Sequence, residues 1–253
     1  MDHNTGEESM IKTINKLFYS IILVVGSLII TQTMTIAEAN TGVPSEVEVF
    51  FTENKDPTPP LNPKDPNEHV EVISDLPIKP GTEGPLSVDF APNVVFGEQE
   101  ASEEDDVYYA QLTKVRKKSD DTVDEVPNYI QITDNRGKDN GWKLTVKQNG
   151  QLRNGDHILV GAEMMLKNVT LISPNDNKKP IYTKDILLDP VASQPIEVSK
   201  SDEKTGKGTW IIMFGSNLSE SKKSIQIKVP GDTDKKRGKY TTSLTWELVD
   251  SPI

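Results

Sequence analysis

Cysteine is absent from this chain of 253 residues. Its absence excludes a disulfide scaffold, a thiolate zinc site, an iron–sulfur cluster and a cysteine nucleophile. Stability must therefore come from buried apolar area, and the chain is long enough for one sizeable domain with such a core. Only 34% of the residues are hydrophobic, which indicates that part of the chain lies outside any core.

Histidine is also scarce, because the whole chain holds only His3, His69 and His157. The first two lie in N-terminal segments without strand patterning, so His157 alone remains for a folded domain. No Gly-x-Ser-x-Gly segment accompanies it, and zinc needs more nitrogen ligands than one. The acidic clusters lack the ligand spacing of an EF-hand. We therefore predict that the protein is not an enzyme and that it binds no cofactor or metal.

The chain has fewer basic than acidic residues. Its 28 Lys and Arg residues and 39 Asp and Glu residues give a formal net charge of −11. Neutralising the phosphates of nucleic acid requires clustered Lys and Arg. The short basic cluster at residues 235–237 is too small to supply this. Nucleic acid is therefore excluded as a partner, and ion pairing alone is a poor way for this chain to bind an anionic wall polymer.

The chain has one long apolar run, at residues 17–30, and it follows two basic residues, Lys12 and Lys16. Small residues with the spacing of a signal-peptidase site come after it, Ala37 and Ala39. This pattern predicts a secretory signal peptide at residues 1–39. A retained transmembrane anchor is the alternative, but the run is shorter than the ~20 residues that span a bilayer. We expect a secreted protein with no stable membrane span after cleavage.

Prolines recur closely from residue 57 to residue 85, with acidic residues between them. Each proline fixes its φ angle and removes a hydrogen-bond donor, which disfavours helices and central strands. Charged, proline-rich segments extend as stiff spacers. We therefore predict that residues 40–83 form a disordered Pro/acidic linker, in which residues 47–51 are the one strand-like stretch.

Residues 84–253 are predicted to form an all-β domain, an antiparallel β-sandwich. Short runs of alternating apolar and polar residues predict strands, and Asn149-Gly150 and Asn154-Gly155 are typical of tight hairpins. In residues 166–172 the alternation places Leu166, Asn168, Thr170 and Ile172 on one side. The expected strands are residues 86–90, 108–112, 129–132, 142–146, 157–160, 166–172, 196–198, 209–214, 224–229 and 240–248.

Two of these strands carry the same pattern, Trp-x-Leu, as Trp142-Lys143-Leu144 and Trp246-Glu247-Leu248. With their surroundings, residues 84–253 resemble the WxL domain, in which two such motifs occur in this order in secreted proteins of Gram-positive bacteria. The segments that carry the resemblance are residues 84–90, 96–97, 134–137, 141–142, 208–211, 214–215 and 240–248.

The resemblance implies non-covalent attachment to the cell surface, with peptidoglycan as ligand and, as partners, companion wall proteins that carry a membrane anchor. It points to four residues as wall-binding or fold-supporting: Trp142, Leu144, Trp246 and Leu248. The chain shows no sortase motif of the LPxTG kind, which also leads us to expect non-covalent retention.

A saccharide could pack its ring face on an exposed aromatic side chain, and Trp210, Tyr182 and Tyr108 are the candidates if they are exposed. Trp210 lies in an apolar run, which favours burial in the core instead. Two other functions stay open. The domain could be an adhesin or surface-assembly subunit that binds a protein partner. It could also be a wall hydrolase, because a glycosidase needs only two carboxylates.

Overall fold

The computed structural model describes residues 45–50, 52, 54–137, 140–192 and 194–251. The chain divides into two compact units, residues 1–50 and residues 51–253. Within the first unit, residues 45–50 form no regular secondary structure. The predicted signal peptide lies outside the described residues. None of the helices among the described residues is long and apolar enough to cross a membrane.

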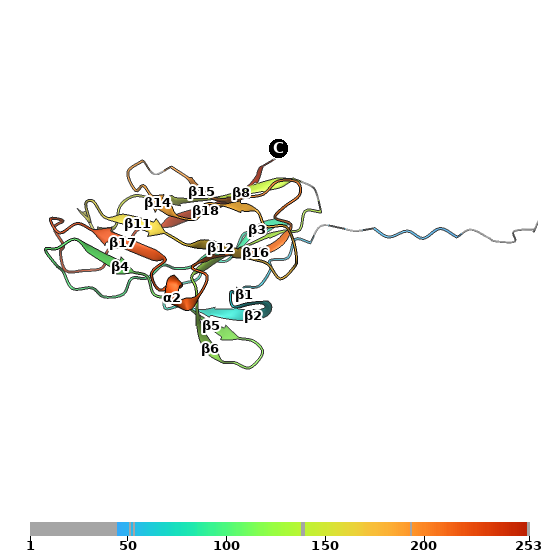
Figure 1. Ribbon diagram of the computed structural model, residues 1–253, viewed down its shortest axis with the longest axis horizontal. Helices are drawn as coiled ribbons and strands as arrows, with labels where there is room; N and C mark the ends of the chain where they lie inside the picture. Colours follow the sequence, from blue (N-terminus) through green and yellow to red (C-terminus); the bar gives the residue numbers. More distant parts are fainter. Residues whose placement is uncertain (1–44, 51, 53, 138–139, 193, 252–253) are drawn as a thin grey trace, which may run out of the picture. The chain divides into compact units, whose positions relative to one another are not determined.

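The regular secondary structure of the second unit is almost entirely antiparallel strand, in several sheets packed together, which confirms the predicted all-β, sandwich-like class (Figure 1). The central sheet has the strand order β12 (Val169–Ile172), β16 (Gly208–Phe214), β7 (Tyr129–Asp134) and β3 (Leu86–Phe90). The motif sheet, so named because it holds both Trp-x-Leu segments, has the order β13 (Ile181–Tyr182), β15 (Ile196–Lys200), β8 (Gly141–Gln148) and β18 (Leu244–Ser251).

Two further sheets complete this unit. The distal sheet has the order β14 (Ile186–Leu188), β11 (Glu163–Leu166), β17 (Ile225–Val229) and β4 (Asp106–Tyr109). The outer sheet has the order β1 (Leu61–Asn62), β2 (Asp65–Ile73), β5 (Thr113–Lys117) and β6 (Val123–Val126). A small hairpin, β9 (Arg153–Asn154) with β10 (His157–Ile158), and a single helical turn, α2 (Leu218–Ser221), lie between the larger elements.

The central sheet is buried on both faces. Along β16, Trp210, Ile212 and Phe214 pack into the main core, which the motif and distal sheets also line. The alternate residues, Ile211 and Met213, pack into a second core beneath the outer sheet. Because successive side chains of a strand point to opposite faces, this uninterrupted apolar run is explained by burial on both sides.

The prediction of a disordered linker is wrong for residues 61–73, because β1 and β2 lie there and pair with each other, and β2 also pairs with β5. Pro66 does not interrupt β2, since only residues 70–73 of that strand pair with β5. The chain just before β1 is fixed by Gln131 of the central sheet. Its Oε1 accepts a hydrogen bond from the Leu61 N–H at 2.8 Å, and its Nε2 donates to the Pro59 carbonyl at 3.1 Å.

The strand predicted at residues 166–172 is in fact two strands in two different sheets. Asn168 lies at the break with a positive φ of 55°, a conformation that asparagine tolerates better than most residues. Its side chain donates to the Ser224 hydroxyl at 3.1 Å. The break shifts the alternation, so Val169 and Leu171 are buried in the main core, whereas Thr170 and Ile172 are only half-buried.

A buried carboxylate, Asp89, lies on the face of the central sheet that the outer sheet covers. It accepts hydrogen bonds from the hydroxyls of Ser87 at 2.7 Å and Thr133 at 2.6 Å, and from Gln131 Nε2 at 3.1 Å. Desolvation by burial raises the pKa of Asp89 above its ordinary value, against the opposing effect of these hydrogen bonds. Folding therefore favours the neutral form of Asp89.

We expect Asp89→Asn to remove one pH-dependent contribution to stability. A raised pKa in the folded state means that the contribution of Asp89 to stability is present below the ordinary pKa of 3.8 and is lost as pH rises through the folded value. The free energy of unfolding of the variant, minus that of the parent, should thus increase over this pH interval. Urea unfolding at a series of pH values measures this, with the exposed Asp75→Asn as control. A difference that does not change with pH would contradict the assignment.

Candidate functional site: the motif strands and an exposed face of the distal sheet

The two Trp-x-Leu segments lie side by side on adjacent antiparallel strands, β8 and β18 (Figure 1). Leu144 of the first motif stands directly opposite Leu248 of the second, and Trp246 stands opposite Val146. This one strand pair therefore brings together two segments that lie about a hundred residues apart in the sequence. All four motif side chains contribute to the main core, but to different degrees.

Trp142 is fully buried and fixes the loop that follows β15. Its indole Nε1 donates to the Gly206 carbonyl at 2.9 Å, and its backbone N–H donates to the Ser201 hydroxyl at 3.0 Å. A Cβ at Gly206, where φ is +76°, would lie 2.8 Å from the indole nitrogen and 2.4 Å from the Ser201 Cβ. Glycine is therefore required at 206, and Trp142 has no surface left to offer a ligand.

The segment just before the first motif holds a buried ion pair. Arg136 Nε donates to Asp134 Oδ1 at 2.8 Å, and its Nη2 donates to Asp134 Oδ2 at 2.8 Å. The same guanidinium donates to the Gly141 carbonyl at 3.2 Å and forms an ion pair with Asp250 at 2.8 Å. The hydrogen bonds and charge of Asp134 raise the pKa of Arg136. Arg136 thus ties the end of β7 to the ends of both motif strands.

The second motif lies at the rim of the core. Trp246 and Leu248 are half-buried, and the Trp246 ring packs at a tilt against Phe214, with 6.2 Å between ring centroids. Leu144, in contrast, is fully buried. Both side chains of the first motif are therefore fully buried, whereas the second motif keeps part of its surface in contact with solvent.

The structure separates the three aromatic residues that the sequence nominated as sugar platforms. Trp210 is only 1% exposed and donates from Nε1 to the Lys207 carbonyl at 3.1 Å, so its nomination is wrong. Tyr108 is half-buried against the small cluster of Leu159 and Ile227, with its hydroxyl donating to Asp106 Oδ2 at 3.1 Å. Tyr182 is 39% exposed, at the edge strand β13.

An exposed row of side chains crosses the outward face of the distal sheet, and the sequence reasoning missed it. The strand registers align Leu187 with Met165, Met165 with Gln226, and Gln226 with Tyr109. Leu187 is 51% exposed and Tyr109 is 41% exposed, whereas Met165 and Gln226 are half-buried. Tyr109 was detectable from the sequence, because it alternates with Tyr108 and the two must face opposite ways.

A second row runs beside the first, formed by Glu163, Lys228 and Val107 in register. Lys228 forms an ion pair with Asp105 at 3.2 Å. Charged and amide groups therefore flank the apolar side chains of the first row. We call the two rows together the distal face; it is amphipathic and formed by regular strands rather than by loops.

A family model described as the WxL domain, surface cell wall-binding, matches residues 38–252. The chain belongs to the WxL family. No curated protein and no solved structure matches it. The matched segment covers most of the chain and includes β1 and β2, which agrees with their place in the folded unit. Membership supports non-covalent attachment to the cell surface through a wall-binding domain, and the family is one of binding domains rather than enzymes.

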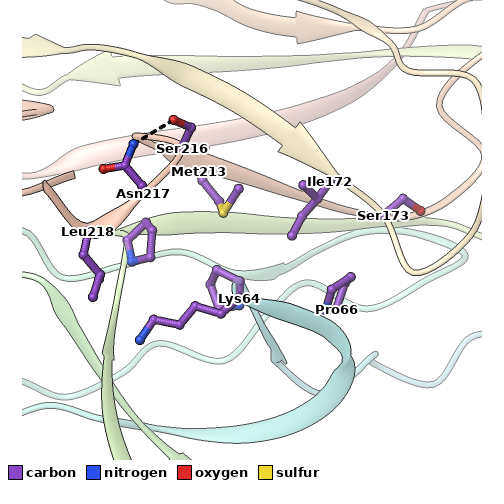
Figure 2. A pocket seen from close by; sticks show the side chains of 10 residues that line it. Lys64, Pro66, Ile172, Ser173, Met213, Ser216, Asn217 and Leu218 are labelled. Atoms are coloured by element: carbon purple, nitrogen blue, oxygen red, sulfur yellow. Dashed lines mark hydrogen bonds between the residues drawn. The ribbon is translucent and has the colours of Figure 1, made fainter. Parts of the chain in front are cut away.

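The groove drawn in Figure 2 lies between the outer sheet and the end of the central sheet and has a volume of about 590 Å³. Its walls are mainly proline and aliphatic side chains, with Lys64, Ser173, Ser216 and Asn217 as the polar members. None of the described lining residues is a histidine or a carboxylate, and no group of metal-ligating side chains occurs in the described part of this WxL chain. The groove has no pair of groups for acid–base chemistry.

We expect the two motif tryptophans to differ in their effect on stability. Trp142→Phe removes the indole donor to Gly206 and leaves a void in the core, so the free energy of unfolding should fall by about 2–4 kcal/mol. Trp246→Phe removes a smaller buried area at the rim and should cost less than about 1.5 kcal/mol. Urea unfolding followed by circular dichroism measures both. Equal losses would contradict the distinct roles assigned to the two residues.

Proposed function

We propose that this WxL protein binds peptidoglycan by packing its glycan strands on the distal face. The supporting observation is the exposed row of Tyr109, Gln226, Met165 and Leu187 across four strands. Neighbouring strands are about 4.8 Å apart, so the row is longer than a single sugar ring. A polymer of repeated rings suits such a row better than a compact small molecule, which prefers a concave pocket.

The chemistry of the distal face matches that of an N-acetylated sugar. The C–H face of a pyranose ring is apolar and packs on aromatic and aliphatic surface, which Tyr109 and Leu187 supply. The Gln226 amide can bond the N-acetyl group or a hydroxyl. Lys228 and Glu163 stand alongside for further hydroxyls or the peptide stem. Because this contact does not depend on net charge, the acidity of the chain does not oppose it.

Partners beyond the polymer also belong to this proposal. We infer that the protein, once secreted, acts within a surface complex whose other members are companion wall proteins with a membrane anchor. The distal face occupies one sheet only, which leaves other surfaces of the domain for such proteins. The competing function is that of an adhesin that binds only protein partners. An adhesin of this kind would have no affinity for purified wall.

We expect Tyr109→Ala to lower the affinity for sacculi stripped of teichoic acid by about tenfold or more, because truncating a large aromatic side chain within a binding contact commonly costs over about 1.4 kcal/mol. Co-sedimentation of the purified protein with the sacculi measures this. Tyr182→Ala is the matched control, since Tyr182 is about as exposed (39% against 41%) but lies on the motif sheet.

Three outcomes separate the possibilities. Loss of binding with Tyr109→Ala but not with Tyr182→Ala supports the distal face. The reverse result moves the site to the motif sheet and contradicts the proposal. Parent protein that ignores sacculi altogether, while it binds companion wall proteins, would favour the adhesin or assembly subunit instead.

A further inference from the structure

One edge of the motif sheet carries backbone groups without partners. The Asn149 N–H donates to the Ser243 carbonyl at 2.9 Å, and in this register the hydrogen-bonded pairs of an antiparallel ladder then recur at every second residue. Thr245, Glu247 and Val249 therefore direct their backbone groups toward β8. Four residues direct theirs away from β8: Leu244, Trp246, Leu248 and Asp250. Among the described residues, nothing hydrogen-bonds to these outward groups.

The neighbouring sheet edge is treated differently. On β3, the edge strand of the central sheet, the Val88 carbonyl accepts from the Thr82 N–H at 2.9 Å, and the Val88 N–H donates to the Thr82 hydroxyl at 2.9 Å. Gly81 allows this close approach, because a Cβ there would lie 2.6 Å from the Val88 carbonyl. The chain thus covers the β3 edge with its own residues and leaves the β18 edge open.

β18 has few of the features that usually protect an exposed edge. It is eight residues long, has Glu247 and Asp250 as its charged residues, and contains no lysine, arginine or proline. It pairs with β8 without a bulge. Such edges readily accept a strand from another chain. Half-buried apolar side chains follow the edge on its core side, namely Leu244, Trp246 and Leu248, with Leu86 packed on the same core from the adjacent strand β3.

A strand of suitable pattern occurs elsewhere in the same chain. Val47 and Val49 alternate with Glu46 and Glu48, followed by Phe50. Val47 is 94% exposed and Phe50 is 86% exposed, and residues 45–50 have no regular secondary structure. An exposed apolar segment with β patterning has a driving force to add to a sheet.

We propose that residues 46–50 of one copy pair antiparallel with β18 of a second copy. Residues directly opposite each other in a ladder point to the same face. In the antiparallel register Val47 lies opposite Leu248 and Val49 lies opposite Trp246, so both would cover the half-buried rim and direct their N–H groups at β18. Glu46, Glu48 and Phe50 would lie on the solvent side, where Glu48 stands opposite Glu247 and the like charges oppose the contact. Residues 46–50 and the β18 edge are different surfaces of the chain. The contact is therefore head-to-tail and continues from copy to copy.

Such a chain of copies would link many wall-binding faces. Each linked domain binds at a high effective concentration, so the assembly would hold the wall far more tightly than one domain does. The inference does not rest on the proposed wall ligand, because self-association is measured without any wall material.

The test is sedimentation velocity of the exported chain after removal of its leader, over a series of protein concentrations. We expect oligomers larger than a dimer that grow with concentration. Val47→Pro with Val49→Pro removes the two N–H groups aimed at β18 and should weaken self-association by about tenfold or more. Glu46→Pro with Glu48→Pro is the matched control, because it removes N–H groups that face away, and it should leave self-association within about threefold of the parent.

Each other result overturns the proposal. A parent chain that stays monomeric at every concentration excludes the contact between copies. If the Trp246 and Leu248 amides are then protected from hydrogen exchange, the segment occupies the edge of its own copy instead. Equal effects of the two double variants would indicate a contact through side chains without strand pairing.

Discussion

The antiparallel pairing of β8 with β18 is the interaction on which the rest of the domain depends. It joins the middle of the chain to its last strand and places Leu144 against Leu248. The first motif, at the interior of the motif sheet, holds the loop at Gly206 through the Trp142 indole. Arg136 then locks the ends of both strands to the central sheet. The repeated Trp-x-Leu pattern is thus a pair of partners in one ladder rather than two separate binding sites.

Closing the core in this way frees the outward faces of the sheets for function. Trp142 and Leu144 have no solvent-facing surface, whereas Trp246 and Leu248 keep part of theirs. The distal sheet buries Met164 and Ile227 on its inner side and presents Met165 and Gln226 on the other side. In the proposed function the strands hold these side chains at fixed spacing, so the polymer would bind with little reordering of the protein. The net negative charge of the chain would repel polyanions without weakening an uncharged contact.

Much of the fold could be predicted from alternation alone, and β3 appeared with its bounds unchanged. The failures have physical causes. β1 and β2 were missed because prolines argue against strands. Here the prolines lie at positions where no backbone N–H is needed for strand pairing, and this is apparent only once the pairing partners are known. The break at Asn168 was missed because a single positive φ has no strong sequence signal in asparagine. For the site, alternation showed that Tyr108 and Tyr109 point to opposite faces of their strand, but not which of the two is exposed. In the structure Tyr108 is half-buried and Tyr109 is exposed.

The register of the two motif strands is tested most directly by proton–proton NOEs on isotope-labelled protein at low concentration. In an antiparallel sheet the pairs that do not share hydrogen bonds bring their Cα atoms to about 4.5 Å, which gives strong Hα–Hα contacts. We predict such contacts between Leu144 and Leu248 and between Val146 and Trp246. Contacts shifted by one residue, or none between these strands, would contradict it.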